Sequence, residues 1–159
     1  MRAEKLSFIF AAKLLIVQQY ISSLFSLVHM PKRLLILVAF LGAIAVMLGA
    51  FGAHALKEKL NEHEMEIFNK GIQYHFVHVL AALFVILLNE KLRNKLIACA
   101  AYFFVTGIFF FSGSLYLLAT KNILGMENTN WLIPITPLGG VFFIGGWLLL
   151  VGGIIKSKN

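Results

Sequence analysis

The sequence predicts an all-α integral membrane protein: a bundle of four transmembrane helices, with a short amphipathic helix in an outer loop and an apolar N-terminal extension. The composition predicts this class, since 60% of the 159 residues are hydrophobic and only 13% are charged. Soluble domains carry about 25% charged residues, so an ordinary soluble fold is excluded. The apolar residues also fall in long uninterrupted blocks. Because backbone groups in lipid must be satisfied within a segment, each block is expected to be a helix, and its lack of alternation excludes a β-barrel.

Residues 1–29 precede the first clear span. The stretch from Leu6 to Val28 is apolar but is interrupted by Lys13 and by several glutamine and serine residues. It is open to four interpretations: an interfacial helix, a fifth span, a signal peptide, or residues upstream of a true start at Met30. We expect an N-terminal extension (1–29) followed by a four-helix membrane domain (30–159).

Four stretches of that domain lack charged residues and are long enough to cross a hydrocarbon core, which takes about 20 residues. The expected spans are about 34–56, 71–89, 96–120 and 132–155. Because the last stretch contains Pro134 and Pro137, its continuous helix is expected to start near Pro137. The charged loop from Ala55 to Lys70 has apolar residues at near-helical spacing, which predicts a short helix on the membrane surface.

The net charge of +7 is explained by topology. One side of the predicted spans carries seven basic residues and the other carries four; these are Lys32, Arg33, Lys91, Arg93, Lys95, Lys156 and Lys158 against Lys57, Lys59, Lys70 and Lys121. The positive-inside rule therefore predicts both ends of the four-span unit in the cytoplasm. No basic stripe with interleaved aromatic residues is present, so the expected partner is the lipid bilayer and not a nucleic acid.

Two spans carry small residues along one helical face. The glycines on these faces are Gly42, Gly49 and Gly52 in the first span and Gly139, Gly146 and Gly153 in the fourth. Small residues allow the close backbone approach by which membrane helices associate, so both faces are predicted to pack against other helices.

Histidines supply the main candidate for a binding site. His75 and His78 are three residues apart on one face of the second span, Tyr74 lies beside them, and His54 ends the first span. Three imidazoles could ligate a metal or haem, or one could hydrogen-bond a quinone. The interpretation we favour is that they hydrogen-bond to facing helices and stabilise the bundle. The sequence leaves the cofactor and any metal unknown.

Further polar groups are expected at a similar depth. These are Ser112, Ser114 and Tyr116 in the third span and Thr136 beside Pro137 in the fourth. In lipid such a cluster is either a packing network or a binding site. No span contains a carboxylate or a basic residue, which disfavours autonomous ion pumping.

Four motifs in order resemble the DUF423 family, the small four-helix membrane proteins that include the eukaryotic transmembrane protein 256. They are the segments 49–54 (GAFGAH), 74–78 (YHFVH), 111–116 (FSGSLY) and 136–140 (TPLGG), the last followed by Gly146 and Trp147. The resemblance covers about residues 30–156. It implies a bacterial inner-membrane protein with four spans, and it implies no catalytic residues.

The sequence therefore favours a non-enzymatic accessory or structural subunit that packs through its glycine faces against itself or a larger membrane complex. One alternative is a binding protein for haem, quinone, lipid or metal through the histidine cluster. The other is a pathway for a small solute, which four short spans could form only as an oligomer.

Overall fold

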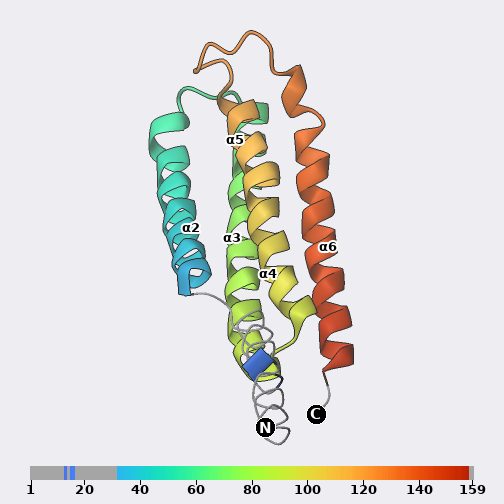
Figure 1. Ribbon diagram of the computed structural model, residues 1–159. Coiled ribbons are helices and arrows are strands. Elements are labelled where there is room, and N and C mark those ends of the chain that lie inside the picture. Colours follow the sequence, from blue (N-terminus) through green and yellow to red (C-terminus); the bar gives the residue numbers. More distant parts are fainter. Residues whose placement is uncertain (1–12, 14, 17–31, 158–159) are drawn as a thin grey trace, which may run out of the picture.

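Four long helices lie side by side in the computed structural model, which describes residues 13, 15, 16 and 32–157 (Figure 1). All four are long and apolar enough to cross a membrane, and the described residues contain no strand. The predicted extension, residues 1–29, lies almost entirely outside the described residues. We name the two ends of the bundle by what they contain. The terminal end holds the start of the first helix, the turn at residues 93–94 and the end of the last helix, and the loop end holds residues 57–61 and 121–134.

The first span is α2 (Lys32–Phe51), continued without a break by the π-helical segment η1 (Gly52–Leu56). Its 25 residues agree with the predicted span at 34–56. At 1.5 Å per residue it is about 38 Å long, enough to cross a hydrocarbon core of about 30 Å.

The second span is longer than its uncharged stretch. Helix α3 runs from Glu62 to Leu92, so the loop predicted to hold a separate surface helix, Ala55 to Lys70, holds none. Its residues 62–70 form the first turns of the span itself, and residues 57–61 form the turn before it. A capping box begins the helix: Asn61 accepts a hydrogen bond from the backbone of Glu64, and the Glu64 side chain accepts one from the backbone of Asn61. Because these bonds satisfy two of the free N–H groups at the helix start, the helix begins in the charged segment.

The third span consists of α4 (Lys95–Gly107), the π-helical segment η2 (Ile108–Ser112) and α5 (Gly113–Thr120), which follow one another directly. After α5, the chain turns at Gly125, whose φ of +64° is accessible to glycine without strain. The backbone N–H of Met126 donates to Lys121 O and that of Gly125 to Asn122 O, the pair of bonds that closes a Schellman turn.

The fourth span begins with a short 3₁₀ turn, η3 (Asn130–Leu132), and continues as α6 (Ile135–Lys156). The helix starts two residues before the predicted Pro137. Proline is tolerated there because the first turn of a helix has backbone N–H groups that need no intrahelical partner.

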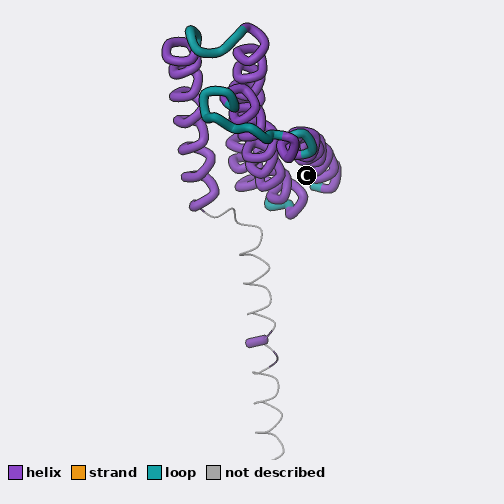
Figure 2. The backbone as a smooth tube through the Cα atoms, turned by 90° about the horizontal axis from the view of Figure 1, so that it is seen from above, coloured by secondary structure: helices purple, strands orange, loops and turns teal. Residues whose placement is uncertain are grey.

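The helices follow one another in space as they do in sequence, which the view from above makes clear (Figure 2). Helix α3 packs against α2 on one side and α4 and α5 on the other, while α6 packs mainly on α4 and η2. The outer helices are therefore the most exposed. Of the most apolar stretch of each span, 22% is buried in the first and 28% in the fourth, against 50% in the third.

Candidate functional site

The predicted polar residues lie between the middle of the bundle and the loop end. Helices α3 and α5 run antiparallel, and Gly71 fixes their register: a Cβ atom added there would lie 2.9 Å from Cε1 of Tyr116. Glycine at this position leaves room for the Tyr116 ring. One turn further into the bundle on each helix lie His75 and Ser112, both of which are buried.

His75 and Tyr116 form a hydrogen-bonded pair between α3 and α5. The Tyr116 hydroxyl lies 3.1 Å from Nδ1 of His75. The other ring nitrogen, Nε2, is buried and has no hydrogen-bond partner among the described residues, and the residue is only 3% exposed. His75 therefore joins α3 to α5 through one of its ring nitrogens, Nδ1.

His78 uses both ring nitrogens. Nδ1 lies 2.8 Å from the carbonyl oxygen of Tyr74, so Nδ1 carries the proton and donates it. Nε2 then accepts from the indole N–H of Trp147 in α6, at 3.4 Å. The imidazole also stacks on Phe143, with ring centroids 3.5 Å apart and planes 9° apart. These contacts join α3 to α6 and occupy both nitrogens that could otherwise ligate a metal.

The two serines of the third span differ in their partners. The Ser114 hydroxyl donates to Phe111 O at 2.9 Å and lies 2.7 Å from the hydroxyl of Thr136, which therefore donates to it. This bond links α5 to the first turn of α6. Ser112, in the π-helical segment η2, is fully buried, and within the part of the chain that the structure describes its hydroxyl has no hydrogen-bond partner.

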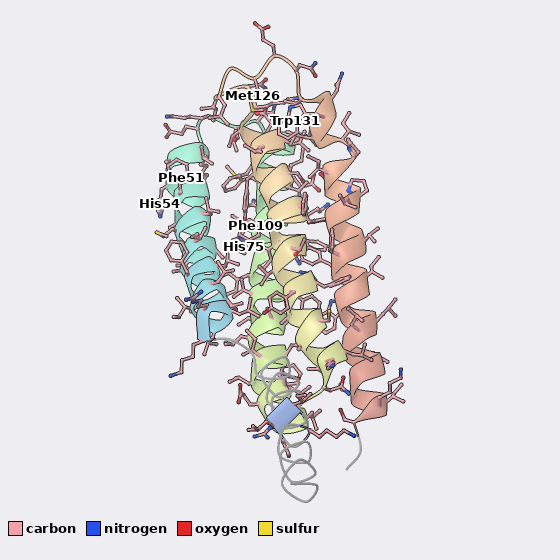
Figure 3. All side chains as sticks on the ribbon, viewed as in Figure 1. Phe51, His54, His75, Phe109, Met126 and Trp131 are labelled. Atoms are coloured by element: carbon pink, nitrogen blue, oxygen red, sulfur yellow. The ribbon has the colours of Figure 1, made fainter. Side chains whose placement is uncertain are left out.

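The structure does not bring the three candidate histidines together. His54 is exposed on η1 and lies on the outer side of the first span, away from His75 (Figure 3). Tyr74 is 38% exposed and lies against Phe111, with ring centroids 4.5 Å apart. Among the residues that the structure describes, no three histidine, cysteine, aspartate or glutamate side chains gather so as to hold a metal ion.

The predicted glycine faces lie against helices of the same chain. In α2 and η1, Gly42, Gly49 and Gly52 face Val79, Ile72 and Phe68 of α3, and in α6, Gly139, Gly146 and Gly153 face Phe111, Phe104 and Ile97 of the third span. At Gly146, for example, a Cβ atom would lie 2.6 Å from the Phe104 ring. These faces are therefore already covered within the chain.

One polar contact at the loop end is absent from the sequence prediction. Glu64 is only 8% exposed, and besides capping α3 it accepts a hydrogen bond from the side-chain amide of Asn122, at 2.6 Å. The contact ties the start of α3 to the turn after α5. The capping bonds can be recognised in the sequence, because an asparagine is followed three residues later by a glutamate. The hydrogen bond from Asn122 to Glu64 has no such signal in the sequence.

Comparison with known proteins gives one consistent result. A family described as "Protein of unknown function (DUF423)" matches residues 48–140. The chain is 39% identical to the UPF0382 membrane protein YwdK of Bacillus subtilis, over 79% of this chain and 98% of that protein. It is 39% identical to a UPF0382 membrane protein of Haemophilus influenzae, over 82% and 99%. It is 36% identical to the UPF0382 inner membrane protein YgdD of Escherichia coli, over 80% and 93%. No solved structure is a significant match.

Proposed function

The chain belongs to the DUF423 family of membrane proteins, and we propose that it is a non-enzymatic accessory subunit that packs against other helices in the membrane. Its partner is either a second copy or another subunit of a membrane complex. The name of the Escherichia coli relative supports a place in the bacterial inner membrane. The basic residues at the terminal end support an orientation with both ends of the four-span unit in the cytoplasm.

The polar pairs inside the bundle support a structural role. The bonds His75–Tyr116, His78–Trp147 and Ser114–Thr136 each join two different helices. Hydrogen bonds across membrane helices are worth about 0.6 kcal/mol on average and up to about 1.7 kcal/mol, so three of them hold the helices in a fixed register.

The observation that carries the proposal is the outward face of α2. Helix α2 packs almost entirely on α3, through Leu34, Val38, Leu41 and Ala45. On the opposite side lie three exposed alanines, Ala39, Ala43 and Ala50, within about 40° of one another at 100° per residue. Small residues on a lipid-facing surface allow another helix to approach closely. This alanine face replaces the glycine faces as the surface available to a partner.

The test is the native mass of the full chain purified in mild detergent. The wild type is expected to run as a homo-oligomer or with a stoichiometric partner. Ala43→Leu and Ala50→Leu are expected to lower that mass, because each adds a bulky side chain to the proposed contact. Cys99→Leu, which makes a similar change at an exposed position of α4, is the matched control and keeps the wild-type mass.

Two results would refute the packing role. One is a wild-type chain that runs as a monomer without a partner. The other is an alanine variant that keeps the wild-type mass while its helical content is unchanged. Either result would be compatible with the fold described above, but it would remove the reason to assign a function to the α2 surface.

A ligand-binding role is the second candidate, and two buried polar atoms favour it. Nε2 of His75 and Oγ of Ser112 have no hydrogen-bond partner, although buried polar atoms almost always have one. An optical and metal scan of the same purified fraction tests this role. A chromophore or stoichiometric metal that is lost in His75→Ala would support it, and a fraction without either would count against haem, quinone and metal.

A further inference from the structure

Basic residues dominate the terminal end of the bundle. They are exposed and come from all four spans: Lys32, Arg33, Lys91, Arg93, Lys95 and Lys156. Glu90 is the one acidic residue among the described residues of this end. At the loop end, the four lysines are matched by five glutamates, Glu58, Glu62, Glu64, Glu66 and Glu127. Over residues 32–157, the excess of positive charge is therefore at the terminal end.

Hydrogen bonds join two of the segments that carry these basic residues. The side-chain amide of Asn94, in the turn between α3 and α4, donates to Gly153 O at 3.1 Å and to the Ser157 hydroxyl at 3.4 Å. The backbone N–H of Asn94 donates to the side chain of Asn89, which is 1% exposed, at 3.0 Å. The α3–α4 turn is thus tied to the end of α6. Lys95, which follows Asn94, and Lys156, which precedes Ser157, belong to these two tied segments.

The helix dipoles explain only some of these basic residues. Lys91 and Lys156 lie in the last turns of α3 and α6, where positive side chains are favourable. Lys32, Arg33 and Lys95 lie at the first residues of α2 and α4, whose first turns contain no acidic residue. A positive side chain at a helix start opposes the dipole. By contrast, α3 starts at the loop end with Glu62 and Glu64, as the dipole favours.

Apolar side chains border the charged surface. Ile154 and Ile155, next to Lys156, are 48% and 78% exposed. A ligand that contacts both the basic residues and the exposed isoleucines needs a negatively charged headgroup joined to an apolar tail. An anionic phospholipid has this chemistry. We propose that the terminal end binds the phosphate of an anionic phospholipid through Lys91, Lys95 and Lys156, with its acyl chains against the exposed isoleucines. Basic clusters next to transmembrane helices bind anionic headgroups in this way.

The experiment measures lipid binding to the full chain in mild detergent, by native mass and by thermal unfolding. Phosphatidylglycerol is the probe and phosphatidylcholine is the zwitterionic reference. The wild type is expected to retain phosphatidylglycerol preferentially and to unfold at a higher temperature in its presence. In the variant Lys91→Gln/Lys95→Gln/Lys156→Gln, the affinity for phosphatidylglycerol should fall about a hundredfold, since each basic residue contributes roughly a fivefold factor.

The matched control removes the same charge at the loop end. Lys57→Gln/Lys59→Gln/Lys121→Gln should keep the wild-type affinity, although it lowers the net charge equally. Equal retention of the two lipids by the wild type would overturn the proposal, and so would an equal loss in the control. If glycerol phosphate raises the unfolding temperature as much as phosphatidylglycerol, the site recognises a free phosphate and the assignment to lipid is wrong. These outcomes do not depend on the α2 packing surface.

Discussion

Gly139 is the glycine of α6 whose neighbour is least able to move. A Cβ atom added there would overlap the backbone N–H of Phe111, not the end of a flexible side chain. Gly139 also follows Thr136 by one turn, at the point where α5 and α6 are joined by the Ser114–Thr136 bond. The small residue and the polar pair therefore act on the same helix contact.

We expect Gly139→Ala to destabilise the protein by about 1–3 kcal/mol, because overpacking at a fixed backbone forces the helices apart. The measurement is reversible unfolding in mixed micelles. Gly113→Ala is the control: nothing lies within 4 Å of its added Cβ atom, and alanine favours a helix over glycine by up to about 1 kcal/mol. Equal destabilisation by both changes would contradict a specific contact at Gly139.

The Ser114–Thr136 bond is expected to show a measurable coupling energy. A double-mutant cycle with Ser114→Ala and Thr136→Val should give about 0.6–1.7 kcal/mol, which are the average and the maximum for hydrogen bonds between membrane helices. The reference cycle combines Thr136→Val with Thr120→Val. The hydroxyl of Thr120 donates to Tyr116 O within its own helix and not to Thr136. That pair should be additive. A Ser114–Thr136 coupling no larger than the reference would show that the bond does not stabilise the bundle.

At the scale of helices, α3 shows what the sequence can and cannot predict. The existence of all four spans follows from uncharged length, and the structure confirms it. The start of α3 does not follow from uncharged length. The uncharged stretch begins at Gly71, whereas the helix already begins at Glu62, in the charged segment. The capping signal at Asn61 and Glu64 was present, but a charged amphipathic segment is equally compatible with a separate surface helix.

The sequence predicts how deep in the membrane the candidate site residues lie. It does not predict which of them face the interior of the bundle. Charge-free spans with known ends place His75, Tyr116 and Ser114 at similar depths. A span that is apolar on all sides carries no periodic signal for the face that turns inward. His54 was therefore grouped with the other histidines, whereas the buried positions of the first span place it on the outer side.

Removing the Glu64 side chain should loosen the loop end. Glu64→Ala deletes the reciprocal half of the capping box and the bond from Asn122, so we expect a loss of about 1–2 kcal/mol. Hydrogen exchange should rise in the first turn of α3 and in the turn after α5 together. Glu66→Ala removes an exposed glutamate that pairs with the exposed Lys70, at 3.6 Å, and should change little. Faster exchange in α3 alone would mean that the Asn122 bond does not tie the two segments.

For the whole molecule, the sequential arrangement of helices determines which surfaces remain available. Because each outer helix packs mainly on one neighbour, the protein has a well-buried centre in α3 and α4 and two largely exposed faces on α2 and α6. The hydrogen-bonded polar pairs His75–Tyr116, His78–Trp147 and Ser114–Thr136 lie between the helices, and the charged groups lie at the two ends. Contacts with a partner helix and contacts with lipid headgroups therefore involve different parts of the molecule.

The orientation in the membrane is the remaining property of the whole molecule that can be tested directly. Four spans place the start of α2 and the end of α6 on one side, and the excess of basic residues there predicts that this side is cytoplasmic. With the sole cysteine removed by Cys99→Ser, we expect Asn128→Cys in the loop end to react with a membrane-impermeant maleimide on intact bacterial cells. Ser157→Cys at the terminal end should react only after the membrane is permeabilised. The reverse pattern would show that the acidic loop end is cytoplasmic, and that the charge difference between the two ends does not set the topology of this chain.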